Sequence, residues 1–276
     1  MNWRNRGKPL VIILTILLLL LILFPFFVML STMLKSGKEV YTSPPNWIPR
    51  KFVFSNFITV WKEYDLFGYF VSSFIIAIGA TVFNTLLSVP AAYAVSRLRF
   101  PGRKLILYMF LVIQMFSPVI VVISLFKIIA RIHLLDTYIS LIITDTVFTL
   151  AFTTWMMNGY FKSIPIDIEE AALIDGCTRT QTITKIMLPI AVPGLVTTMI
   201  YTFIYAWNEF LFALSFIQSK PKMPLTIGLY NFVGRWSTQW QYLTMSAFYA
   251  IIPVLVLFYL IEKRLVAGLA GGAVKE

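Results

Sequence analysis

Residues 167–189 read DIEEAALIDGCTRTQTITKIMLP and predict two short helices joined by a tight turn. The first helix is expected to end at Gly176, because glycine readily adopts the left-handed conformation that closes many helices. The second is expected to end near Pro189, because an interior proline removes a backbone hydrogen bond. A capping-box pattern, which marks helix starts, occurs twice, at Asp167 with Glu170 and at Thr178 with Gln181.

The first predicted helix has one face of low relief. Spacings of three and four residues place four side chains on that face, and two of them are alanines that another protein can approach closely. We therefore interpret residues 167–189 as a docking element, with an ordinary amphipathic loop as the alternative. The four side chains of the predicted docking face are Ile168, Ala171, Ala172 and Asp175.

The surrounding chain has the composition of an integral membrane protein. Of its 276 residues, 59% are hydrophobic and only 13% are charged, whereas soluble domains are nearer one half and one quarter. The net charge is +11, but the cations lie mostly between apolar runs, which favours lipid headgroups and membrane orientation over nucleic acid. The single cysteine, Cys177, excludes an intrachain disulfide bond.

Six apolar stretches are long enough to cross a bilayer, since a spanning helix needs about 20 residues. Backbone polar groups must be satisfied within a segment that faces lipid, so each stretch is predicted to be a helix. The fold class predicted is therefore an all-α membrane protein with six transmembrane helices, forming a single domain over residues 1–276. The stretches are Leu10–Leu34, Phe67–Val95, Leu105–Ile129, Tyr138–Met157, Leu195–Ile217 and Leu243–Ile261.

The distribution of lysine and arginine predicts how the helices are oriented. Cations precede the first stretch, fill the short second link and follow the last stretch, and these three regions lie on one side if six helices alternate. Both termini and the loop 160–193 are therefore expected to be cytoplasmic. The cations on that side are Arg4, Arg6, Lys8, Arg97, Arg99, Arg103, Lys104, Lys263 and Arg264, and those on the other side are in longer loops.

The loop 160–193 resembles the EAA loop of permeases from binding-protein-dependent ABC importers. Its pattern is Glu-Ala-Ala, three residues, Gly, nine residues and Ile-x-Leu-Pro, and this chain matches it without a gap. Segment 91–102 resembles the end of the second helix of the family and its basic turn, and 206–210 resembles the fifth-helix motif of carbohydrate permeases. The tail 266–275 resembles the glycine-rich end of the maltose-type subfamily. The residues that match the EAA pattern are Glu170, Ala171, Ala172, Gly176, Ile186, Leu188 and Pro189. The resemblance implies that these residues, together with Asp175, couple to an ATPase.

The resemblance implies a type I ABC importer permease that carries a sugar or oligosaccharide across the cell membrane of a bacterium or archaeon. Such a subunit is not an enzyme and binds no cofactor. It works with a second permease, usually a different chain, with two ABC ATPase subunits that use ATP, and with an extracytoplasmic solute-binding protein. The chain agrees with this in having no Gly-x-x-x-x-Gly-Lys-Ser/Thr phosphate loop.

Two acidic residues, Asp145 and Glu209, fall inside the apolar stretches, where an unpartnered charge is costly. Polar groups beside aromatic rings suit a sugar, so these positions predict a substrate pathway, with inter-helix hydrogen bonding as the alternative. Lone His133 has no neighbouring ligands that would predict a metal site. The residues of the predicted pathway are Asp145, Trp155, Tyr205, Asn208 and Glu209.

Three other functions are consistent with a membrane protein of this size. The same architecture could carry another solute, such as a polyamine or glycerol phosphate. An ion-coupled secondary transporter would need no ATPase, but more buried ionisable groups and a paired repeat are typical of that class. An intramembrane enzyme is disfavoured because the sequence lacks the His-Glu-x-x-His and Gly-x-Ser-x-Gly motifs.

Overall fold

The computed structural model describes residues 8–273, and Arg4 and Arg6, used above for orientation, lie outside them. Within the described residues every named element is a helix, and a single isolated β-bridge joins Val233 to Thr238. The chain divides into two compact units. One comprises Met1–Leu66 and Leu229–Ile252, and the other comprises Phe67–Gly228 and Pro253–Glu276.

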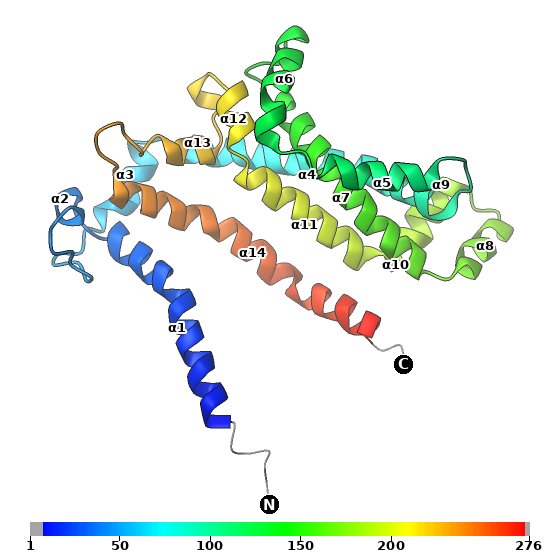
Figure 1. Ribbon diagram of the computed structural model, residues 1–276, viewed down its shortest axis with the longest axis horizontal. Coiled ribbons are helices and arrows are strands. Elements are labelled where there is room, and N and C mark those ends of the chain that lie inside the picture. The colour runs from blue at the N-terminus through cyan, green and yellow to red at the C-terminus, as the bar shows by residue number, and fades with distance from the viewer. Residues whose placement is uncertain (1–7, 274–276) are drawn as a thin grey trace, which may run out of the picture. The chain divides into compact units, whose positions relative to one another are not determined.

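The larger unit is built around α7 (Tyr138–Ser163), which packs against α11 (Val192–Asn208) along its length (Figure 1). The long helix α4 (Leu66–Arg97) also contacts α7. Glycine makes a close approach possible, because a Cβ at Gly79 of α4 would lie 2.6 Å from the Ile142 side chain of α7. The helices therefore pack closely, as membrane helices do at small residues.

Polar side chains also link α4 to α7 in the interior. The Asn84 side chain donates to the Thr149 hydroxyl at 2.7 Å and accepts from the Thr153 hydroxyl at 2.8 Å. All three residues are buried. Hydrogen bonds of this kind satisfy polar groups that would otherwise be costly in a lipid environment.

The stretch Leu105–Ile129 was predicted to be one helix, and this prediction is wrong. The chain forms α5 (Arg103–Ile113) and α6 (Pro118–Arg131), with a break between them. Ser117 is extended, with ψ of 130°, and Pro118 stands in the first turn of α6. A residue before proline is disfavoured in the helical region, so Pro118 accounts for the break.

The stretch Leu195–Ile217 is likewise not one helix. It contains α11, an interruption at Glu209, and the short helix α12 (Leu211–Phe216). Glu209 is extended, and its carboxylate accepts from the backbone N–H groups of Phe212 at 2.7 Å and Ala213 at 2.8 Å. An acidic side chain that caps the next helix in this way competes with continuation of the first.

The smaller unit contains α1 (Lys8–Met33), α2 (Gly37–Val40), α3 (Ser55–Lys62) and the first part of α14 (Trp240–Ala273). Buried Asn56 joins the end of α1 to α3, because its amide donates to the carbonyls of Met33 and Lys35. Trp61 and Tyr249 pack edge to face at 5.0 Å between ring centres. The α13 helix (Leu225–Tyr230) and a 3-10 turn (Lys220–Lys222) precede α14.

Four described helices, rather than the six predicted, are long and apolar enough to cross a membrane on their own. These are Val11–Met33, Leu66–Arg97, Tyr138–Ser163 and Trp240–Leu260. A fifth is added if Arg179–Ile190 and Val192–Asn208, bent by 87°, count as one span. The side chains of α1 from Val11 to Phe26 are exposed, which is the pattern of a helix surrounded by lipid or by other membrane helices.

Candidate functional site

The predicted docking helix is α8 (Ile166–Ile174), which follows directly after α7 (Figure 1). It begins two residues earlier than the predicted capping box implies, after Pro165, and no side chain caps its start. The predicted capping box of Asp167 with Glu170 is therefore wrong. Asp167 lies inside the first turn instead, where its charge is favourable to the helix dipole.

The turn after α8 has the predicted geometry. Gly176 has φ of +87°, and a Cβ added there would meet no atom within 4 Å. The N–H of Gly176 donates to the carbonyl of Leu173, and that of Cys177 donates to the carbonyl of Ala172. These two bonds form a Schellman motif, which favours glycine at this position.

The second helix of the loop begins at the predicted capping box. The Thr178 backbone N–H donates to the Gln181 side chain at 2.8 Å, and the Gln181 N–H donates to the Thr178 hydroxyl at 3.3 Å. The chain runs through α9 (Arg179–Gln181), a π-helical stretch (Thr182–Met187) and α10 (Leu188–Ile190). It thus ends one residue after Pro189.

A sharp elbow connects this second helix to the membrane. At Ala191 the chain bends by 87° into α11. Just beyond the bend, a Cβ at Gly194 would lie 2.3 Å from the Tyr160 ring of α7. Ile186 and Leu188 are half-buried and Pro189 is exposed, so the last part of the EAA pattern lies at the start of this elbow.

A buried ion pair anchors α8 to the ends of two long helices. The Arg97 guanidinium, at the end of α4, lies 3.0 Å from the Glu169 carboxylate, and each side chain is only 9% exposed. Arg97 also donates to the carbonyls of Phe161 and Ile164 at the end of α7, at 2.7 and 2.6 Å. The Tyr93 hydroxyl donates to the other oxygen of Glu169.

Sequence reasoning missed this role of Glu169. Its neighbour Glu170, which carries the family pattern, is exposed. The direction of Ala172 was also predicted wrongly, because this residue is only 4% exposed and faces the protein with Glu169. The outward surface of α8 instead includes Glu170, Ala171, Asp175 and the 86%-exposed Ile174.

Three of the five predicted pathway residues lie close together near the junction of α11 and α12. Asp145 of α7, Tyr205 and Glu209 interact electrostatically. Tyr205 and Glu209 line an open cavity of about 500 Å³, together with Tyr201. The described residues contain no group of three side chains placed to hold a metal ion.

The other two predicted pathway residues differ in position. Asn208 lines the same cavity, and its amide donates to the Ile204 carbonyl at 2.8 Å. Trp155, on α7, is 48% exposed and is not among the described residues that line this cavity. Thr198 and Thr202 of α11 direct their hydroxyls to carbonyls of their own helix.

A polar site also joins two loops of the larger unit. The Asp136 carboxylate accepts from the Ser219 hydroxyl and from the backbone N–H groups of Gln218 and Ser219. Lys222 lies 3.0 Å from the same carboxylate. These contacts, the Ser219 hydroxyl foremost, hold the pKa of Asp136 well below its usual range.

Comparison with known proteins places the chain among membrane permeases. It is 35% identical to the sulfoquinovosyl glycerol transport system permease protein of Agrobacterium fabrum, over 98% of this chain and 94% of that protein. It is 34% identical to the trehalose/maltose transport system permease protein of Thermococcus litoralis, over 96% of each. The trehalose transport system permease protein of Mycobacterium tuberculosis is 38% identical over 83% of this chain and 84% of its own length.

The fold agrees with these sequence relatives. A chain from the crystal structure of a bacterial ABC transporter that imports the polysaccharide alginate superimposes with a TM-score of 0.81, at 23% identity, over 95% of this chain and 99% of that one. The sequence profile of one family matches residues 84–269, which include α8 and its anchor. The resemblance seen in the EAA loop is thereby confirmed: the chain belongs to the family of binding-protein-dependent transport system inner membrane components, as a permease and not an enzyme.

Proposed function

We propose that this chain is the permease subunit of an ATP-driven importer for a sugar or oligosaccharide in a bacterium or archaeon. The observation that carries the coupling part of this proposal is the anchored helix α8. Its outer surface is exposed, while Arg97 and Glu169 fix its inner side to the ends of α4 and α7. A subunit that grips α8 would therefore move two membrane helices.

The proposed partner at α8 is an ABC ATPase. Nine residues are too few for a stable isolated helix, so the order of α8 depends on its anchor and its capped turn. The exposed residues Glu170, Ala171, Asp175 and Gly176 would contact the ATPase. Closure of the ATPase dimer on ATP would then be coupled to opening of the pore as one two-state equilibrium, while this chain binds no cofactor itself.

The proposed membrane topology has six crossings with both termini in the cytoplasm. It includes α5 with α6 as the third crossing, interrupted near its middle, and α11 with α12 as the fifth, interrupted nearer its end. Interrupted helices are tolerated in membranes where the freed backbone groups find partners, as the Glu209 carboxylate provides for α12. A second permease, two ATPases and an extracytoplasmic binding protein would complete the importer.

A sugar is favoured as the substrate for two reasons. Three relatives that align along most of the chain are named as permeases for glycosides, namely sulfoquinovosyl glycerol, trehalose and maltose. The cavity beside Glu209 also combines the tyrosine rings of Tyr201 and Tyr205 with an amide and a carboxylate. Rings can stack on the C–H faces of a sugar, and the polar groups can bind its hydroxyls.

The experiment that tests the proposal is affinity purification of the tagged chain from its native membrane. We expect an ABC ATPase, a second permease and a binding protein to be recovered, and we expect ATP hydrolysis by this assembly to be stimulated by a sugar together with the binding protein. Stimulation by polyamines or glycerol phosphate instead would overturn the sugar assignment. Transport by the chain alone along an ion gradient would overturn the importer.

A further inference from the structure

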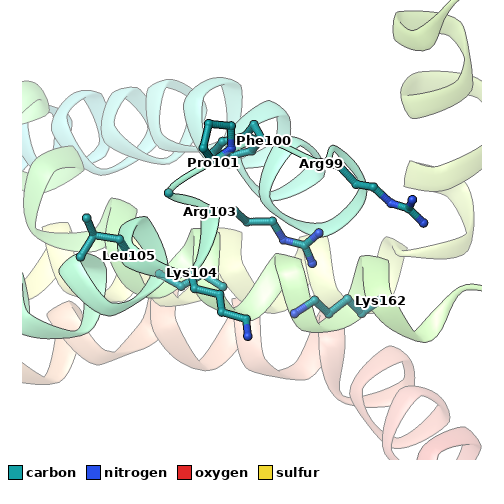
Figure 2. Close-up of a pocket in the computed structure, with 9 residues that line it drawn as sticks. Arg99, Phe100, Pro101, Arg103, Lys104, Leu105 and Lys162 are labelled. Atoms are coloured by element: carbon teal, nitrogen blue, oxygen red, sulfur yellow. The ribbon is translucent and has the colours of Figure 1, made fainter.

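A strongly basic pocket lies in the larger unit, and its lining includes no described residue of α8 or of the cavity beside Glu209. It is formed by the turn between α4 and α5 and by the last turn of α7, and it encloses about 770 Å³. In Figure 2, the guanidinium group of Arg103 and the amine of Lys162 point toward one another. The cations that line the pocket are Arg99, Arg103, Lys104 and Lys162.

No acidic side chain lines this pocket among the residues whose side chains are described. Among the residues whose side chains the structure describes, 11–110 and 112–260, the ion pairs are Arg97 with Glu169 and Lys222 with Asp136, so none of these pairs involves the four pocket cations. Arg103 makes only a long hydrogen bond of 3.4 Å, to the Leu98 carbonyl. The pocket lining therefore carries four cations without an ion-pair partner, and like charges this near one another repel unless an anion is bound.

The backbone adds to this positive potential. The helix α5 begins at Arg103, and the residues of its first turn, Arg103 to Leu105, line the pocket, so the free N–H groups of a helix start lie beside it. Gly102, which precedes it, has φ of +84° and provides no side-chain cap. A phosphate oxygen could therefore take the place of the missing cap while also contacting the surrounding cations.

An apolar stripe leads away from the pocket along α5. Leu105, Tyr108, Met109 and Val112 follow the spacing of one helix face, and each is more than half exposed. Leu105 also lines the pocket itself. The stripe begins where the cations end, so the site is polar at one end and apolar along its length.

We propose that this pocket binds the phosphate headgroup of an anionic phospholipid, whose acyl chains lie along the stripe on α5. A free phosphate ion would satisfy the cations equally well, but it would leave the apolar stripe without a partner. A zwitterionic lipid would bring a cationic group into a pocket that is already positive. An anionic amphiphile fits both parts of the site.

Native mass spectrometry of the purified full-length chain, with any subunits that co-purify, tests this proposal. The probes are phosphatidylglycerol and phosphatidylcholine with identical acyl chains. We expect at least tenfold tighter binding of phosphatidylglycerol. Each cation near a membrane surface contributes about fivefold, so the triple variant Arg99→Gln, Arg103→Gln and Lys162→Gln should lose on the order of 100-fold.

A matched triple variant removes the same charge elsewhere. Arg50→Gln, Lys51→Gln and Lys220→Gln change exposed cations outside the pocket and should retain phosphatidylglycerol binding. Equal losses in both triple variants would overturn the proposal in favour of diffuse electrostatic attraction. If the pocket variant fails to fold, the single variant Lys162→Gln should still lose about fivefold, and no loss would overturn the site.

Inorganic phosphate separates the two sources of the anion. At equal ionic strength, phosphate should displace phosphatidylglycerol no better than chloride does, because it cannot occupy the stripe. Selective displacement by inorganic phosphate would overturn the lipid assignment and make this a site for a soluble phosphate. Leu105→Ser together with Met109→Ser should weaken lipid binding severalfold, whereas an unchanged affinity would show that the stripe is not used.

Discussion

Replacing Glu169 by glutamine should detach α8 from the membrane helices. Its carboxylate is almost fully buried, lies 3.0 Å from the Arg97 guanidinium and accepts a hydrogen bond from Tyr93. Removing one partner of a buried pair costs about 3–5 kcal/mol. We expect the lower end, about 3 kcal/mol, because Arg97 keeps its bonds to the Phe161 and Ile164 carbonyls.

The loss should be visible as local opening of α8. A nine-residue helix has little stability of its own, so weaker anchoring shifts it directly toward the unfolded form. About 3 kcal/mol corresponds to a roughly 100-fold rise in the opening constant. Hydrogen–deuterium exchange of the backbone amides of residues 167–176, measured on the chain in lipid nanodiscs without the ATPase, reports this change.

The matched control is Glu170→Gln, one residue further along the same helix. Glu170 is exposed, so its neutralisation should change exchange by less than about twofold. Equal exchange in the two variants would refute the anchor. In the assembled importer, Glu169→Gln should also raise the ATP hydrolysed for each solute transported, because the ATPase would then move α8 without moving α4 and α7.

Three further predictions concern other parts of the larger unit. Gly176→Leu should cost about 1–2 kcal/mol through its positive φ alone and uncouple transport from ATP hydrolysis, whereas Gly176→Asn should retain coupling. Gly194→Ala should lower the free energy of unfolding by about 1–3 kcal/mol, and it should lower it by less in a protein that already carries Tyr160→Ala. The lowered pKa of Asp136 stabilises the fold above pH about 4, and this contribution is lost as pH falls. On acidification, the melting temperature of Ser219→Ala should therefore fall less than that of the unsubstituted protein, as measured by thermal unfolding.

Local features of the loop could be predicted from the sequence because each depends on neighbouring residues. The left-handed turn at Gly176 and the capping box of Thr178 with Gln181 are of this kind. The role of Glu169 could not be predicted in the same way. The apolar residues of α8 are spread around the whole helix, so their spacing does not identify the buried face. Arg97, the partner of Glu169, lies on a different helix.

The same distinction explains the errors within the membrane segments. A long apolar run predicts a span but does not show whether the helix is continuous across it. Pro118 is a local signal that would have predicted the break between α5 and α6. Glu209 is ambiguous, because a lone acid in an apolar run can lie inside a helix or cap the next one, and only its bonds to Phe212 and Ala213 decide between these.

The interruptions suggest how movement of α8 would reach the substrate cavity. The loop helix meets α11 at the 87° elbow, and α11 ends at Glu209 beside that cavity. If the elbow were freely hinged, motion of the loop would be absorbed there. Gly194 prevents this, because its lack of a side chain lets α11 pack directly on the Tyr160 ring of α7. Since Arg97 also holds the end of α7, the loop, α7 and α11 should move together, and the flexible point is expected to be the break at Glu209.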